Sequence, residues 1–284
     1  MRQLFQMVAL ATALLCLGVA ISAAQQTIPA PTGYSLVWHD EFDGDKVEDG
    51  NWTFENWAKW RVNRELQYYV AGGEFDGVET ASVKDGVLTI RARKYNGSKL
   101  FNDRTAIDGE VISARMNSKG RWKYGYMEAR IKLPKGKGTW PAFWMMPEDE
   151  SLRWPACGEI DIMEEVGMHP DYTSSSIHCR AYNHPMKTQK TAEKYTEGAE
   201  GEFHVYAVEW TEDYLQFSVD GSTEGCLRFE NDKAGNVDTW PFDKEFYIIL
   251  NLAWGGSWGG SDGVDDSALP CEMQVDYVRV FQKE

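Results

Sequence analysis

The sequence predicts an all-β protein, and three observations lead to this fold class. Segments of alternating apolar and polar residues recur along the chain, for example in 126–133 and 203–210. Turn-forming pairs such as Asp85-Gly86 separate these segments. No convincing amphipathic helix is found between them. Many short strands in a chain of 284 residues indicate a β-sandwich or a β-barrel.

Further strands are expected where β-branched and aromatic residues cluster between turn signals. Segment 203–210 is followed by 214–220, and the pair predicts a hairpin that ends at Asp220-Gly221. The remaining expected strands are 83–92, 246–252 and 273–281.

The first residues have the features of a secretory signal peptide. Arg2 precedes an apolar run over 4–21, and small residues end the segment at Ala24. We therefore expect a cleaved signal over 1–24. A lipid anchor at Cys16 is the less favoured alternative, because the residue before that cysteine is not small.

The rest of the chain is expected to form a short extended leader over 25–33 and a single domain over 34–284, a length that all-β domains commonly reach. The formal charge of −15 argues against nucleic acid or an anionic membrane as a partner and favours a neutral ligand. No later apolar run is long enough for a transmembrane segment. We expect an exported monomer in the periplasm, at the cell surface or outside the cell.

The motif that organises the chain places three acidic residues within six positions. Glu159 and Asp161 are two apart, so on a strand their side chains share a face. Glu164 is out of phase and would point into the core, where an unpaired charge is costly. One extra residue near Ile162-Met163, a β-bulge, would bring Glu164 to the face of the other two acids.

This arrangement suits the hydrolysis of a glycosidic bond. With a bulge, the two glutamate carboxyl groups can approach to about 5 Å, the spacing of retaining glycosidases. Three acids this close should titrate together and keep at least one proton to high pH, as a general acid requires. A solvated charged face and a calcium site remain alternative interpretations of the same residues.

Aromatic side chains near the acids favour a carbohydrate ligand. Trp140 and Trp144 lie in one apolar segment, and Trp154 precedes the acidic motif. Indoles stack on the apolar faces of sugars, although each could instead fill a core. The segment 60–69 mixes amide, charged and aromatic groups that can bind sugar hydroxyls, and His178 is expected on the strand that pairs with the acidic one.

Other signals are weaker. The glycine-rich segment 255–260 lacks the Lys-Ser/Thr of a phosphate loop and is expected to form a rim loop. The histidines show no zinc-binding spacing.

Sequence alone does not pair the four cysteines outside the signal, but Cys157 and Cys179 could face each other if their strands turn near Gly167. The other two are Cys226 and Cys271.

The chain resembles glycoside hydrolase family 16, in particular its laminarinase-like branch. The resemblance covers nearly all of the mature chain, in order. The residues that carry it are 38–42 (Trp-His-Asp-Glu-Phe), 63–69 (Asn-Arg-Glu-Leu-Gln-Tyr-Tyr), 140–146, 159–164 (Glu-Ile-Asp-Ile-Met-Glu), 249–253 and 275–280.

The resemblance implies a β-jelly-roll sandwich of two curved antiparallel sheets, with an open substrate cleft across the concave sheet. It also implies that 34–284 is one catalytic domain. Glu159 would be the nucleophile, Glu164 the acid/base and Asp161 the residue that tunes the nucleophile. The residues that resemble the family's sugar contacts are Asn63, Arg64, Glu65, Trp140, Trp144, Trp154 and His178.

The resemblance further implies a structural calcium ion on the convex side, with no cofactor required for catalysis. The matching positions are Glu41, the Gly86 carbonyl and Asp276. The chain departs from the family pattern at Arg64, where an amide is common, and at Cys179.

Together these observations predict an exported, endo-acting, retaining β-glucanase. Its substrate would be β-1,3-glucan of the laminarin type, mixed-linkage β-1,3-1,4-glucan, or both. The alternatives are a galactan hydrolase of the agarase or carrageenase type and a non-catalytic glucan-binding jelly roll. The acidic charge disfavours sulfated substrates, and a protein that only binds glucan would not need all three acids.

Overall fold

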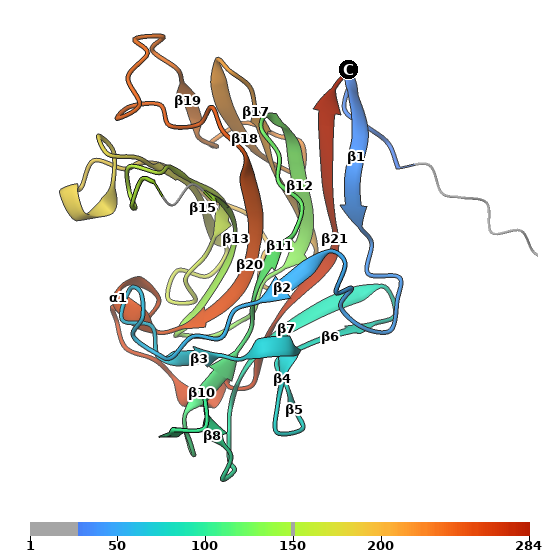
Figure 1. The fold of residues 1–284 in the computed structure, drawn as a ribbon, viewed down its shortest axis with the longest axis vertical. Coiled ribbons are helices and arrows are strands. Elements are labelled where there is room, and N and C mark those ends of the chain that lie inside the picture. Colours follow the sequence, from blue (N-terminus) through green and yellow to red (C-terminus); the bar gives the residue numbers. More distant parts are fainter. Residues whose placement is uncertain (1–27, 149–150) are drawn as a thin grey trace, which may run out of the picture.

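Two curved sheets packed against each other form the protein (Figure 1). The computed structural model describes residues 28–148 and 151–284. Among these residues, the larger sheet consists of β1 (Tyr34–Asp40), β3 (Gln67–Tyr69), β6 (Ala81–Lys84), β7 (Val87–Lys94), β10 (Val111–Ser113), β12 (Gly125–Lys132), β17 (His204–Trp210), β18 (Tyr214–Val219), β19 (Arg228–Glu230) and β21 (Cys271–Lys283).

The smaller sheet carries the acidic motif. Its strands are β2 (Trp52–Phe54), β11 (Arg115–Ser118), β13 (Thr139–Pro147), β14 (Glu159–Glu164), β15 (Tyr172–His178), β16 (Lys190–Tyr195) and β20 (Phe246–Trp254). They lie in the order β16-β15-β14-β13-β20-β11-β2, so β14 has neighbours on both sides. Figure 1 shows this sheet bowed, with its concave side facing away from the larger sheet.

The larger sheet is ordered β19-β18-β17-β12-β21-β7-β10-β3, with β1 paired to β21 and β6 paired to β7. The described residues also form short elements outside the two sheets. These are β4 (Glu74–Phe75), β5 (Val78–Glu79), β8 (Leu100–Phe101), β9 (Thr105–Ala106), the helical turn α1 (Gly256–Gly259), and 3-10 turns at Ala71–Gly73, His184–Met186 and Asp266–Ala268.

The core lies between the sheets. Burial alternates along β12, which places Met127, Ala129 and Ile131 inside and Glu128 and Arg130 outward. Phe143 of β13 and Ile160 of β14 belong to the same buried cluster. Fully burying a side chain of this kind stabilises the folded state by about 1.5–3 kcal/mol. The core therefore fixes which face of β14 points toward the concave side.

The predicted all-β sandwich is confirmed, with differences in detail. The hairpin over 203–220 forms as β17 and β18, whereas the expected strand 83–92 is two strands joined at Asp85-Gly86. Both turn residues have positive φ (53° and 75°), which glycine adopts without strain. One pair, β10 with β3, is parallel, so the sheets are not antiparallel throughout. Segment 255–260 contains the α1 turn and is not only a loop.

The disulfide considered between Cys157 and Cys179 does not form. Cys179 is a free thiol. Because Glu159 pairs with His178, the β14–β15 register continued by one residue would bring Gly158, not Cys157, opposite Cys179. The expected signal peptide and Cys16 lie outside the described residues. Among the residues described, no helix has the length and apolar character needed to cross a membrane.

Candidate active site

The three acids of β14 occupy one face of the smaller sheet. Asp161 lies opposite Ser176 of β15, and Glu164 lies opposite Ser174. Two residues thus separate the acids on β14 while one separates the serines on β15, which defines a bulge. Residues opposite each other in an antiparallel pair share a face. Glu159, two residues before Asp161, lies on that face too, and the predicted bulge is confirmed.

Ile162 is the extra residue of the bulge. On the other side of β14, Asp161 pairs with Trp144 of β13 and Met163 pairs with Phe143, so Ile162 has no partner in either register. It is nevertheless 2% exposed, within the core cluster. The bulge therefore turns Glu164 toward the acids without exposing an apolar side chain.

Each glutamate receives a hydrogen bond from a different tryptophan. The indole Nε1–H of Trp154 donates to Glu159 Oε2 at 2.8 Å, and that of Trp140 donates to Glu164 Oε1 at 3.0 Å. These two tryptophans were predicted as sugar contacts. In the structure, their hydrogen bonds fix the orientation of the Glu159 and Glu164 carboxyl groups.

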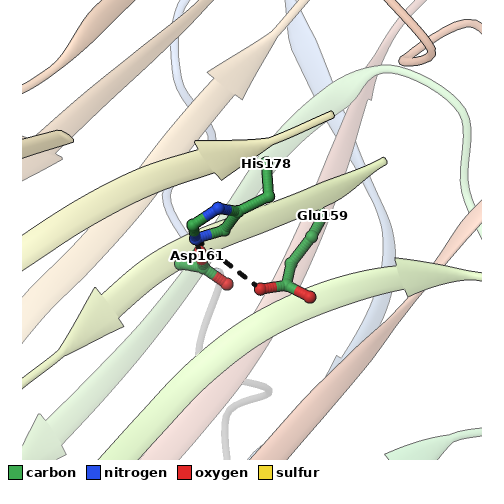
Figure 2. A group of neighbouring side chains, drawn as sticks. All are labelled: Glu159, Asp161 and His178. Carbon is green, nitrogen blue, oxygen red and sulfur yellow. Dashed lines mark ion pairs between the residues drawn. The ribbon is translucent and has the colours of Figure 1, made fainter. Parts of the chain in front are cut away.

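His178 joins Glu159 and Asp161 in one cluster. Its Nε2 lies 3.3 Å from Asp161 Oδ2 and 3.9 Å from Glu159 Oε1, and Figure 2 shows the three side chains pointing toward one another. His178 is 6% exposed. One donor atom from each of the three lies within 4.8 Å of the others, which is close enough to hold a metal ion. The same carboxyl groups suit glycosidic chemistry, which needs no metal.

Burial raises the pKa of all three acids. For Glu159 the next cause is the negative charge of Asp161, and for Asp161 it is that of Glu164. The Trp140 hydrogen bond opposes the upward shift at Glu164. The side chain of Glu159 remains 16% exposed, so a ligand can reach it. These directions agree with the prediction that the cluster retains a proton at high pH.

Trp144, also a predicted sugar contact, lies beside the acids on the concave face. Its Nε1–H donates to Asn251 Oδ1 of β20 at 2.7 Å. The guanidinium of Arg115, on β11, lies over its ring with the carbon 4.6 Å from the centroid. Trp144 is therefore held between two strands of the smaller sheet.

The predicted contacts Asn63, Arg64 and Glu65 come from one loop but differ in their surroundings. Glu65 is 8% exposed and accepts hydrogen bonds from Gln67 Nε2 at 2.7 Å and Asn63 Nδ2 at 3.4 Å. Its charge is close enough to raise the pKa of Glu164. Arg64 is exposed. The loop therefore brings Glu65 to the acids.

The chain shares its sequence pattern with a known family. The pattern of the glycosyl hydrolases family 16 matches residues 74–279. A β-glucanase from Rhodothermus marinus is 40% identical over 278 residues, which cover 94% of this chain and 91% of the relative. The chain belongs to glycosyl hydrolase family 16.

Solved structures agree with this family 16 membership. The structure of SCLam, a non-specific endo-β-1,3(4)-glucanase, has a TM-score of 0.81 and 43% identity, covering 90% of this chain and 94% of SCLam. The laminarinase of Rhodothermus marinus has a TM-score of 0.79 and 40% identity, covering 88% and 97% of the two chains. The jelly-roll prediction is confirmed.

The calcium ligands suggested by the family 16 resemblance are engaged by arginines. Glu41 accepts hydrogen bonds from Nε and Nη2 of Arg279 at 2.9 and 2.7 Å, and Asp276 accepts one from Arg130 at 2.7 Å. Gly86 lies in the turn between β6 and β7. Both oxygens of Glu41 and one oxygen of Asp276 are thus held by guanidinium groups, and the calcium site stays a prediction.

Two polar residues near the site escaped prediction. Asn251 receives the Trp144 indole and donates through Nδ2 to the Tyr69 hydroxyl at 3.2 Å. Arg115 lies over both Trp144 and Trp57. The signal available in the sequence was that Asn251 and Arg115 are polar residues within apolar segments. A polar residue in such a segment indicates a buried side chain with a hydrogen-bond partner.

Proposed function

We propose that the protein is an endo-acting, retaining β-glucanase that hydrolyses β-1,3-glucan, mixed-linkage β-1,3-1,4-glucan, or both. The observation that carries this proposal is the bulge of β14, which gathers Glu159, Asp161 and Glu164 on the concave face. Family 16 membership and glucanase relatives along nearly the whole chain support it.

In the proposed mechanism, the two glutamates act in two steps. Glu164 protonates the leaving glycosidic oxygen while Glu159 attacks the anomeric carbon, which forms a glycosyl ester on Glu159. Glu164 then removes a proton from water as the water attacks the same carbon. Two inversions give net retention of the anomeric configuration. The predicted carboxyl separation of about 5 Å belongs to this retaining mechanism.

Four neighbours have supporting roles in this proposal. Glu159 must be ionised to attack, and the Trp154 hydrogen bond and the nearby His178 both lower its pKa against the effect of burial. Asp161 lies on the same face, and burial and the charge of Glu164 raise its pKa. Asp161 can therefore hold a proton while Glu159 is ionised. Trp140 orients the carboxyl group of Glu164.

The substrate is proposed to be a neutral polysaccharide outside the cytoplasm. A chain with a formal charge of −15 repels sulfated polymers, whereas a neutral glucan meets no such repulsion. We also propose export through the N-terminal segment 1–24 and action as a monomer.

The test compares laminarin, barley β-glucan and agarose as substrates for the wild type and for Glu159→Ala. We expect the wild type to release oligosaccharides with retained configuration from at least one of the two glucans, as followed by NMR of the first products. The variant should still bind the glucan but lose at least about 10³-fold in kcat, because no nucleophile remains. Hydrolysis of agarose alone, or undiminished glucan hydrolysis by Glu159→Ala, would contradict the proposal.

A further inference from the structure

An exposed tryptophan lies on the loop that brings Glu65 to the acids. Trp60 is 62% exposed, although burial is the usual state of so large an apolar side chain. Its backbone is fixed, because Trp60 N–H donates to the Glu65 carbonyl at 2.8 Å and Ser257 N–H donates to the Asn63 carbonyl at 2.7 Å. The exposed ring therefore stands on a loop anchored at both Glu65 and the α1 turn.

The Trp60 ring is supported by a cation. Lys59 Nζ lies 4.5 Å from the ring centroid and also forms an ion pair with Glu110 Oε1 at 2.6 Å. A cation over an indole favours the electron-rich face of the ring. The ammonium group covers part of the ring, and the exposed fraction shows that most of the remaining surface is open to solvent.

A continuous column of rings and guanidinium groups connects this loop to the candidate active site. Arg115 lies 4.6 Å from the Trp144 centroid and 4.2 Å from that of Trp57, and Arg61 lies 4.5 Å from the same Trp57 ring. Arg61 directly follows Trp60. Since two guanidinium groups already cover Trp57, Trp60 is the ring of this region with an open surface.

Trp60 and Glu65 also border one surface hollow together with Trp57 and Tyr69. The Tyr69 hydroxyl lies 3.5 Å from Glu65 and accepts a hydrogen bond from Asn251, which binds the Trp144 indole, so the hollow lies beside Trp144 and has the exposed Trp60 at its rim. A polymer bound across the acids would meet the Trp60 ring at the outer end of this hollow.

We propose that Trp60 is a sugar-binding platform for a glucosyl residue several units away from the bond that is cleaved. This inference rests on the proposed glucanase function and adds a residue that determines preference for long chains. The occupant is the β-glucan chain itself, because the platform continues the surface that leads from Trp144. The apolar face of a glucosyl ring stacks on the open indole face, and Lys59 can donate to a sugar hydroxyl.

The experiment measures kcat and KM on β-1,3-linked oligosaccharides of increasing length for the wild type, Trp60→Ala and Trp60→Phe. In Trp60→Ala, KM should rise about three- to tenfold for the long oligosaccharides, the effect of losing one aromatic contact, with kcat little changed. Trp60→Phe should recover much of the loss. The matched control is Tyr214→Ala on β18 of the larger sheet, whose ring also lies under a guanidinium, that of Arg228 at 3.9 Å.

Binding to Glu159→Gln, measured by calorimetry without hydrolysis, completes the test. Affinity should increase with oligosaccharide length, and adding Trp60→Ala should remove the increase from the outermost sugar. Equal KM and affinity profiles with and without Trp60 would overturn the platform while leaving the glucanase function intact. If the wild type hydrolyses neither glucan, the proposed function fails, and this inference fails with it.

Discussion

Trp140 and Trp154 each donate one indole N–H to a different glutamate. The two glutamates need opposite protonation states at the start of the proposed reaction, since Glu164 must carry a proton and Glu159 must not. A donor stabilises the ionised form and lowers the pKa of the group that accepts it. The same type of contact therefore lowers the alkaline limb of the pH profile when it acts on Glu164 and the acidic limb when it acts on Glu159.

Replacing Trp140 by phenylalanine is expected to extend activity to higher pH. Burial raises the pKa of Glu164, and the Trp140 hydrogen bond limits that increase. Without the donor, Glu164 stays protonated to higher pH, so the alkaline limb of kcat/KM should shift upward by roughly half to one pH unit. The measurement is kcat/KM against pH on a soluble glucan, which reports the free enzyme.

Trp154→Phe is the matched comparison. It removes the donor from Glu159, raises the pKa of that carboxyl group and should move the acidic limb upward instead. A shift of the same limb in both variants would contradict the assignment of nucleophile and acid/base.

The acids and three of the aromatic site residues could be predicted from sequence because local rules decide them. The period of a strand and the cost of a buried charge place Glu164 beside Asp161 once Ile162 is taken as the bulge. Arg115 could not be found this way, and Trp60 was predicted only as part of segment 60–69, without a role of its own. Their roles depend on neighbours that are distant in sequence, Trp144 in one case and the α1 turn in the other.

At the scale of a single element, the strand that carries the acids ends beside a second carboxyl pair. Glu165 directly follows β14 and is 1% exposed, with neither carboxyl oxygen hydrogen-bonded to a described donor. Burial, followed by the charge of Glu200, raises the pKa of Glu165 to about 9. If one of the two carboxyl groups keeps its proton, it can donate a hydrogen bond to the other. The backbone N–H of Glu200 is held by Asp171 Oδ1 at 3.0 Å.

This pair should make stability fall as pH rises. Glu165 loses its proton near pH 4.5 when unfolded but only near pH 9 when folded, so its contribution is complete below about pH 4.5 and is lost between the two values. Glu165→Gln removes this titration. Its free energy of unfolding should match the wild type near pH 5 and exceed it by roughly 2 kcal/mol near pH 8.

Urea denaturation of both proteins at the two pH values measures the difference. Glu200→Gln is the companion variant and should act in the same direction, because it removes the charge that faces Glu165. Equal losses of stability in the wild type and Glu165→Gln between the two pH values would show that Glu165 does not titrate as described.

At the scale of the whole molecule, sequence indicated the strands but not their neighbours. The alternating pattern of 126–133 specifies which side of β12 is buried, yet β12 pairs with β17 and β21, which come much later in the chain. Likewise β13 pairs with β20. Periodicity determines the face of a strand, whereas strand order depends on packing between distant segments. Only the family resemblance indicated two curved sheets.

Within residues 28–148 and 151–284, the fold forms without a disulfide. Cys179, Cys226 and Cys271 are free thiols. Burial raises the pKa of Cys271 to about 12 and also raises those of Cys179 and Cys226, which makes the thiolate scarce at neutral pH. Stability must therefore come from the core between the sheets.

Reducing agent should accordingly have no effect on thermal stability. The melting temperature in dithiothreitol, measured by circular dichroism, should equal that of the untreated protein. A decrease of several degrees would reveal a disulfide that the structure does not contain, since removing a native disulfide commonly costs about 2–5 kcal/mol.

The proposed nucleophile and acid/base stand on one uninterrupted strand, while Glu65 and Trp60 stand on a separate loop. Covalent geometry within β14 therefore sets the interval between the two reacting groups, whatever happens in the loop. A mutation of Trp60 can therefore change which polysaccharide is held without moving the two reacting groups. Substrate preference can thus evolve through the outer loop while the strand that cleaves the bond stays unchanged.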